Sequence, residues 1–395
     1  MLANKGYLAL GKETTKGVAV TPNVFVPYYN EDLFTQMNFH HDNPIMGHKL
    51  ERFKVLPGIR SHRGSITTMA EPNTAGFLLD MILTRVHTTV SGPPLVHTFA
   101  LDNTKDPNSY TIDIQKGNIV ARFAGVEASE LGVDFDENKM VFNLSVSALK
   151  SFIVSEVRHV VREVDVSFIT LWDSGDGSTL TDSLLAGDVM VGTNPDGSSI
   201  NFTINSVLDG NRISTLTDVT ILGQGSIISL RPVVPSFNLL KPFLWSKTEF
   251  RIGDSVAESD PQTRVETGSR WTLRHNFEEE DGARRSGGQD PATLLRTTGD
   301  LEVDIKRVFD NAFSANNWLN RIMDTGLLIK HISDDHSVGP FSLDVWVPNG
   351  RLTEHPVTTE SGSIVYAETK LFPEVPTHTA DRPFQLSLRN LVQTI

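Results

Sequence analysis

Polar and apolar residues alternate along most of this chain, and a period of two is typical of strands with one buried face. Two segments, 74–84 and 314–325, have instead a helical period with one apolar stripe. The pattern therefore predicts a mainly β fold in which two helices pack on sheets. The clearest alternating segments lie at 110–114, 140–146, 301–305, 341–345 and 364–371.

The two predicted helices lie in similar surroundings. Each follows a strand that starts at a glycine, Gly64 or Gly299, and an arginine- and glycine-bearing loop precedes each strand. After each helix come a loop and further alternating strands, which begin at Tyr110 in one case and at Phe341 in the other. This repeated order predicts two divergent copies of one β-sandwich or β-barrel domain, each with one helix.

The sequence pattern changes between the two predicted copies. There, short strands are separated by Gly, Asp and Asn turns at a spacing of about ten residues, as in a small β-barrel or sandwich. Insertions of this kind are tolerated in surface loops. The sequence thus predicts a first domain over 1–157, an inserted small all-β domain over 158–236 and a second domain over 237–395.

Charge and cysteine content exclude several classes of function. The 395 residues carry a net charge of −13, which argues against wrapping nucleic acid or binding an anionic membrane surface. There is no cysteine, so disulfides, thiolate zinc sites and cysteine nucleophiles are excluded. The first residues lack the pattern of a signal peptide and no apolar run is long enough for a bilayer. We expect no membrane partner and synthesis in the cytoplasm.

Segments that suggest catalysis or metal binding are few. His331, Asp334, Asp335 and His336 lie close together and could hold a metal, but a polar loop has the same composition. The acidic, glycine-bearing segment 173–182 lacks the ligand spacing and final glutamate of a calcium loop. Phosphate-binding glycine loops, nucleophile elbows and HExxH helices are absent from the sequence. The sequence predicts no catalytic residue, no metal and no cofactor, and hence a protein that is not an enzyme.

Residues 6–33 resemble the start of phage major tail tube proteins of the long, non-contractile-tail type. In that family an opening strand leads into a turn and then an aromatic-rich strand, here 25–28. The later order is similar as well: an Arg/Gly loop, the strand at Gly64, a helix, and a strand pair matching 122–135. The resemblance covers about 1–155 and, more loosely, 237–395. The turn has the pattern Glu-Thr-x-x-Gly-x-Ala-x-x-Pro, matched by Glu13, Thr14, Gly17, Ala19 and Pro22.

The resemblance implies a structural virion protein with a duplicated tube fold and an inserted β-domain. Its expected partner is itself, because the inner strands of such proteins form a continuous barrel around a lumen. Three chains would make a pseudo-hexameric ring, and rings would stack into the tail tube. Tail terminator, tail tip and tape-measure proteins are further implied partners, and DNA would pass through the lumen without specific binding. The implied location is the virion tail, assembled in the host cytoplasm.

One predicted surface is the lining of that lumen. On the strand that starts at Gly299, acidic residues alternate with apolar ones, and the matching strand of the first copy has polar residues on its equivalent face. An acidic lining would repel DNA phosphates. An ordinary solvated sheet face would have the same pattern. The candidate lining residues are Ser65, Thr67, Glu71, Asp300, Glu302 and Asp304.

A second predicted surface joins one ring to the next. Arginine suits this role because its planar group can pair bidentately with carboxylates across an interface. Simple exposed hairpins would look the same in sequence. The candidates lie in the two loops that precede the glycine-started strands: Gly58, Arg60, His62 and Arg63 in the first, and Arg284, Arg285 and Asp290 in the second.

Other functions remain open at this point. The chain could be a β-sandwich binding or decoration module, on a carbohydrate or on a capsid surface, although only five Trp and five Tyr are present. A metal-dependent enzyme would use the loop at 330–336. The tube subunit of a contractile injection system is a related alternative, but such subunits are usually shorter and not duplicated.

Overall fold

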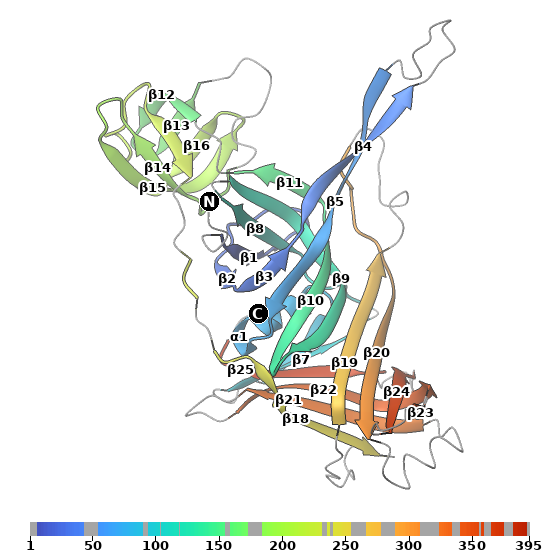
Figure 1. The fold of residues 1–395 in the computed structure, drawn as a ribbon. Helices are drawn as coiled ribbons and strands as arrows, with labels where there is room; N and C mark the ends of the chain where they lie inside the picture. Colours follow the sequence, from blue (N-terminus) through green and yellow to red (C-terminus); the bar gives the residue numbers. More distant parts are fainter. Residues whose placement is uncertain are drawn as a thin grey trace, which may run out of the picture.

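The computed structural model confirms the predicted mainly β fold. Its described residues form 25 β-strands and one α-helix. Nineteen strands join one extended network of sheets, and the other six close into a small barrel (Figure 1). No helix among these residues has the length and apolarity needed to cross a bilayer. The described residues are 6–42, 54–89, 94–102, 104–117, 119–154, 159–172, 184–230, 235–237, 240–253, 266–277, 289–308, 324–333, 340–354, 357–358, 365–374 and 382–392.

The first half of the chain forms two packed layers of strands. β9 belongs to both layers, because its first part pairs with β8 and β11 and its second part pairs with β10. The strand turns from one layer to the other at Gly125, whose φ is +67°. The elements are β1 (Leu8–Lys12), β2 (Val24–Val26), β3 (Tyr28–Glu31), β4 (Phe34–Asp42), β5 (Lys54–Met69), α1 (Pro72–Asp80), β6 (Thr84–Thr89), β7 (Leu95–Ala100), β8 (Tyr110–Lys116), β9 (Ile119–Asp136), β10 (Lys139–Ala148) and β11 (Lys150–Ile153).

The first predicted helix is present but lies slightly earlier than the apolar stripe suggested. α1 starts at Pro72. Proline suits the first turn of a helix because a backbone N–H at that position would have no acceptor within the helix. It ends at Asp80, and Thr84, predicted as helical, already belongs to β6. The helix buries Leu78 and Leu79 in the hydrophobic core.

The described residues of the second half form eight strands. The second predicted helix, over 314–325, lies outside the described residues except for its last two positions. Those two, Asp324 and Thr325, are wrongly predicted as helical, because they begin a strand that pairs with β22. The strands are β18 (Phe243–Gly253), β19 (Glu266–Phe277), β20 (Arg296–Val308), β21 (Asp324–Ser333), β22 (Phe341–Glu354), β23 (Val357–Thr358), β24 (Tyr366–Pro373) and β25 (Gln385–Asn390).

The two halves repeat six antiparallel strand pairings. Chain order and pairing match β8 with β21 and β9 with β22. The sequence matched the strand at Tyr110, which is β8, with the strand at Phe341, which is β22. That match is wrong by one strand, because the structural counterpart of β8 is β21. The repeated pairings are β1–β8 with β18–β21, β8–β9 with β21–β22, β9–β10 with β22–β24, β10–β5 with β24–β20, β4–β5 with β19–β20, and β9–β11 with β22–β25.

The halves are interlocked and do not form separate lobes. β9 of the first half pairs with β19 of the second, and β7 of the first half pairs with β25. Side chains of both halves, such as Leu131 and Leu273, belong to one hydrophobic cluster. Because strands from each half complete sheets of the other, the two copies share one core.

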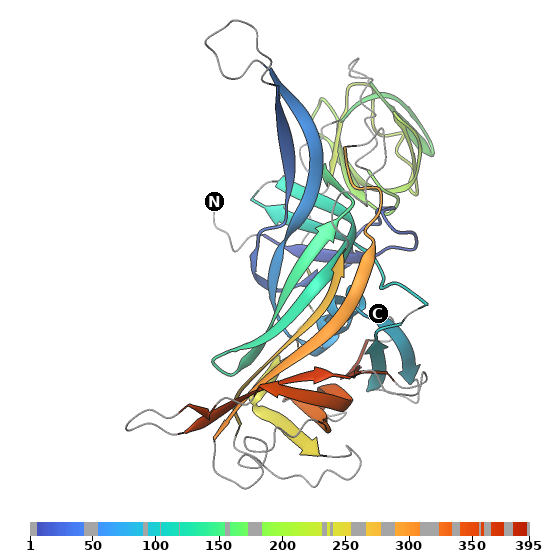
Figure 2. The same cartoon turned by 90° about the vertical axis from the view of Figure 1, so that its right-hand side faces the viewer.

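The remaining six strands lie within the segment predicted as an inserted domain. They close into a barrel in the order β12–β13–β16–β15–β14–β17 around a separate apolar core that includes Ile169 and Phe202. Figures 1 and 2 place this barrel and the projecting β4–β5 hairpin at the same end of the molecule. The strands are β12 (His159–Asp165), β13 (Phe168–Leu171), β14 (Val189–Thr193), β15 (Ser199–Asp209), β16 (Arg212–Thr215) and β17 (Ile227–Leu230).

Candidate assembly surface

A polar face runs across five adjacent strands, in the order β5, β10, β9, β19 and β20. Residues opposite one another on antiparallel strands point to the same face, so the register assigns side chains to rows. The rows bring together residues that are more than 200 positions apart in sequence. One row is Ser65, Ser145, Glu130, Arg274 and Asp300, and the next is Thr67, Asn143, Gly132, Thr272 and Glu302.

The opposite face of the same strands is the core. Its rows are apolar, and a shift of one residue in any strand would exchange the two faces. The register therefore fixes which side chains are outward. One core row is Ile66, Leu144, Leu131, Leu273 and Leu301, all of which are buried.

Five of the six predicted lining residues share this polar face. Ser65 and Thr67 lie on β5, and Asp300, Glu302 and Asp304 lie on β20 with Leu301 and Val303 buried between them. The sequence alternation on these two strands is thus confirmed, and the structure adds that both belong to one continuous surface. That this surface encloses a lumen stays a prediction.

The sixth predicted residue, Glu71, does not lie on this face. It follows the end of β5 and caps α1, where its carboxylate accepts a hydrogen bond from the backbone N–H of Thr74 at 3.0 Å. Its other oxygen accepts a hydrogen bond from the backbone N–H of Leu240, also at 3.0 Å. Glu71 is fully buried, and this burial raises the pKa of its carboxyl group. The alternation failed here because the strand had already ended at Met69.

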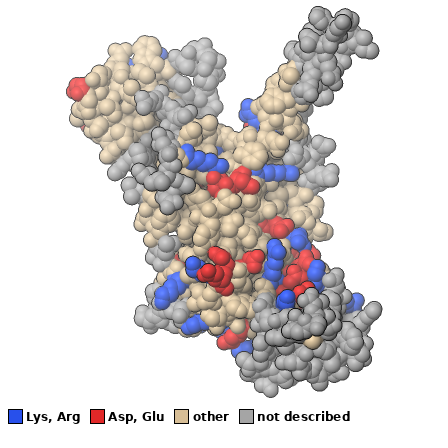
Figure 3. Space-filling view, viewed as in Figure 1, with Lys and Arg blue, Asp and Glu red and all other residues tan. Residues whose placement is uncertain are grey.

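The polar face carries both signs of charge. Arg274 of β19 lies 2.9 Å from Glu302 and 3.5 Å from Glu130 of β9, and Lys370 of β24 lies 3.2 Å from Glu302. The hydrogen bond from Arg274 lowers the pKa of the Glu302 carboxyl group. Figure 3 shows acidic and basic side chains intermingled over β19 and β20. The acidic strand seen in sequence is thus flanked by basic neighbours that only the register reveals.

The predicted inter-ring loops meet within one chain. The buried ring of His62 lies between Thr35, 2.9 Å from Nδ1, and Asp290, 3.3 Å from Nε2. Arg60 lies 3.9 Å from Asp290, and its backbone N–H donates to the carbonyl of Gln289 at 2.9 Å. Burial lowers the pKa of His62. These three candidates therefore join the two halves of the chain to each other.

The other inter-ring candidates have different positions. Gly58 lies where β4 and β5 cross closely, since a Cβ there would be 2.6 Å from the carbonyl oxygen of Asn38. Arg63 is exposed and lies opposite Phe34. Arg284 and Arg285 lie outside the described residues. A contact with a neighbouring ring is a prediction for all of them.

The turn on which the family resemblance depends is built around one buried carboxylate. Glu13 accepts hydrogen bonds from the backbone N–H groups of Gly17 and Gly125, each at 2.8 Å. It also accepts from the hydroxyls of Ser109 at 2.7 Å and Thr111 at 2.9 Å. Gly17 has a φ of +76°, which a glycine adopts without strain. The motif is therefore structural: it fastens the first turn to β8 and β9.

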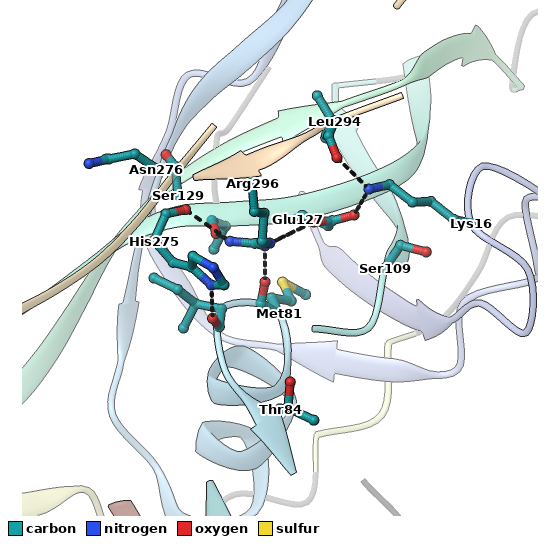
Figure 4. Close-up of polar contacts among 12 residues, drawn as sticks. Lys16, Met81, Thr84, Ser109, Glu127, Ser129, His275, Asn276, Leu294 and Arg296 are labelled. Atoms are coloured by element: carbon teal, nitrogen blue, oxygen red, sulfur yellow. Dashed lines mark hydrogen bonds and ion pairs between the residues drawn. The ribbon is translucent and has the colours of Figure 1, made fainter. Parts of the chain in front are cut away.

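A second buried carboxylate joins the two halves (Figure 4). Glu127 of β9 pairs with Arg296 of β20 at 2.9 Å and with Lys16. Arg296 also donates to the carbonyl oxygens of Met81, at the end of α1, and His275 of β19. One guanidinium group thus links α1, β9 and β19.

The residues that sequence reasoning missed most clearly attach the barrel to the body. Arg122 of β9 is buried and donates to both carboxylate oxygens of Asp113, at 2.7 and 2.8 Å. It also donates to Asp188, which immediately precedes β14 of the barrel, at 3.1 and 3.2 Å. Thr21 donates to Asp188 as well, at 2.9 Å. Asp113 occupies a polar position of the alternating segment 110–114, and no local pattern marks a buried ion cluster.

The loop that sequence offered as an alternative metal site is only partly described. His331 is fully buried inside the sheet, where its Nε2 accepts from the indole N–H of Trp271 at 3.2 Å and its Nδ1 lies 3.1 Å from the Thr248 hydroxyl. Both ring nitrogens are thus occupied by protein groups, which leaves none for a metal. Burial lowers the pKa of His331 to about 3. Asp334, Asp335 and His336 lie outside the described residues.

Comparison with known proteins adds no identification. No protein-family model matches this sequence, and no curated protein matches it significantly.

Proposed function

We propose that this protein is a structural subunit of a phage-type tail tube, in which three chains form a ring of six similar units and rings stack around a channel for DNA. The single observation that carries the proposal is the long sheet with one polar face. It contains equivalent strands of both halves, joined within the chain by the β9–β19 pairing. A subunit that already contains one joint between two similar units needs only the same joint between chains to form a ring.

The two faces of this sheet support a channel. One face is packed into the shared core, so the other must face solvent or a partner. Its mixed charges suit a surface past which DNA slides, because paired acids and bases offer phosphates neither a basic track nor strong repulsion. The face suits a lumen lining because its acidic and basic side chains are paired with each other, and not because it is acidic overall, as the sequence suggested.

The interlocked core supports a rigid building block. Two halves that share strands and the Glu127–Arg296 pair cannot rotate freely against each other. A fixed angle between the units is what a closed ring requires, because each joint must turn by the same amount for the last to meet the first. Partner proteins at the ends of the tube, and the virion location, belong to this same proposal.

The test is negative-stain electron microscopy of the purified protein, fresh and after concentration, combined with light scattering for mass. Rings with six-fold appearance and three chains, alone or stacked into hollow tubes, are the expected result. Monomers that stay dispersed at high concentration, also when tail tip components are added as nuclei, would contradict the proposal. In that case binding to carbohydrates or to capsids becomes the next hypothesis to examine.

A further inference from the structure

We propose that adjacent chains join through the outer edge of β3 and β4 on one chain and the edge formed by the end of β22 and β23 on the next. This inference rests on the proposed function, because it names the partner surface of the same sheet. The partner is a second copy of this chain, and the joint is an antiparallel addition of strand to strand.

The joint inside the chain supplies the template. Residues 130–133 of β9 pair antiparallel with residues 271–274 of β19. In the first unit the strand order is β4, β5, β10 and β9, and in the second it is β19, β20, β24 and β22. The internal joint therefore connects the fourth strand of one unit to the first strand of the other.

The same two kinds of strand lie at the ends of the eight-strand array. Among the described residues, β3 and β4 pair only with β5, so their outer edge has no strand beside it. At the far end, Leu352, Glu354 and the two residues of β23 pair with β24 on one side, and no other described strand pairs with them. β21, as far as the structure describes it, covers the preceding part of β22 up to Arg351. Within the described part of each chain, a fourth-position strand and a first-position strand are thus open.

Exposed apolar side chains accompany one of these edges. Tyr29 of β3 is 55% exposed, and Phe34 and Phe39 of β4 are 54% and 59% exposed. An open strand edge exposes unpaired N–H and C=O groups, and stable proteins cover or blunt such edges. Large apolar groups beside an open edge indicate an interaction surface. A second copy added at this edge would lie beside the exposed aromatic side chains of β3 and β4.

The test uses disulfide cross-linking, for which this chain is well suited because it contains no cysteine. Cross-strand neighbours have Cα atoms about 4.5–5.5 Å apart, which is within the range that a disulfide spans. Tyr29→Cys or Phe34→Cys is combined with one cysteine on the partner edge, and assembled protein is mildly oxidised and separated without reductant. The partner positions are Leu352, Thr353, Glu354, Val357 and Thr358.

Two controls accompany the scan. The double variant Glu130→Cys/Arg274→Cys spans the internal joint, so it must oxidise without any increase in mass. A pair on the barrel surface, Val207→Cys/Leu216→Cys, must give no covalent oligomer. Each edge variant is first shown by electron microscopy to assemble under reducing conditions like the parent, so that a misfolded variant is not scored.

We expect at least one edge pair to give covalent dimers and trimers, with a ladder that stops at three chains. Particles that assemble normally but form no covalent oligomer from any edge pair, while the internal control oxidises, would overturn this joint and leave the tube proposal standing. A ladder that continues past three chains would overturn ring closure at three. If the cysteine-free parent forms no assembly at all, the proposed function fails and the joint fails with it.

Discussion

Removing Arg122 should both destabilise the protein and loosen the barrel, because this side chain is the only described cation in contact with Asp113 and Asp188. We choose Arg122→Met, which keeps an unbranched apolar chain of similar reach but leaves two carboxylates without a counter-charge. Asp113 and Asp188 are 5% and 1% exposed, so water cannot replace the lost donors.

The size of the effect follows from the contacts that are lost. Arg122 makes four N–H···O contacts of 2.7–3.2 Å, two to each acid. Breaking a buried ion pair by removing one partner typically costs about 3–5 kcal/mol, since the remaining charge stays buried. We expect a loss of roughly this size in the free energy of unfolding at about pH 7.5, measured in urea.

The loss of unfolding free energy in Arg122→Met should be smaller in mild acid. Burial already raises the pKa of Asp113, and the hydrogen bonds from Arg122 oppose that shift. Without Arg122 the folded-state pKa of Asp113 rises further above the unfolded value of about 3.9. The folded variant then binds more protons than its unfolded chain, so its stability falls as pH rises through that folded pKa. The difference from the parent should therefore be smaller at about pH 5 than at about pH 7.5.

Two further measurements complete this test. Limited proteolysis should cut Arg122→Met between body and barrel faster than the parent, because the barrel loses its main polar attachment. Arg162→Met is the matched control, since Arg162 is an exposed barrel residue whose guanidinium lies 5.6 Å from the Trp172 ring, and it should change stability by less than about 1 kcal/mol. A loss below about 1 kcal/mol for Arg122→Met, or one that is the same at both pH values, would refute the reasoning.

Three other predictions follow from surfaces and buried groups. Arg284→Glu combined with Arg285→Glu should weaken ring stacking and leave the monomer folded, and tubes of normal length in electron micrographs would reject that assignment. Asp300→Lys combined with Asp304→Lys should make the polar face basic, so that assembled particles retain DNA at low salt and release it at high salt; assembled particles with no gain in DNA retention would argue against a lumenal position. The free energy of unfolding of the parent should fall as pH decreases from about 6.5 to about 4, because the lowered pKa of His331 keeps the folded ring neutral while the unfolded chain binds a proton. His331→Gln should reduce this fall, and an unchanged pH profile would contradict the neutral buried ring.

Much of the fold was predictable because alternation is a local signal. β8, β10, β20 and β22 all lie where the sequence predicted strands, and the barrel strands lie within the segment predicted as an insertion. The turn at Glu13 was identified through its resemblance to a family pattern of Glu, Gly and Pro, although the reason for that pattern, a carboxylate that fastens β8 and β9, needed the structure. Boundaries were less exact, as at Glu71.

The sequence could not predict which distant strands pair with each other. The pairing of β9 with β19 and of β7 with β25 depends on residues more than 100 positions apart, and no local pattern specifies it. For the same reason the acidic strand at Asp300 was predicted to make an acidic face, whereas its neighbour Arg274 makes the face mixed. The contact of His62 with Asp290 likewise turned two predicted outer loops into partners of each other.

The pairing of β7 with β25 also sets the order in which a newly made chain can finish folding. β7 ends at Ala100 and its partner strand begins only at Gln385, with His97 bonded to the carbonyl of Val392 at 2.8 Å. At translation rates of about 5–20 residues per second, β7 waits roughly 15–60 s for its neighbour to be synthesised. Completion of the sheet that contains β7 and β25 therefore waits until β25 has been synthesised. A nascent chain in which β25 has not yet been made lacks a finished second unit, which delays its association with other chains.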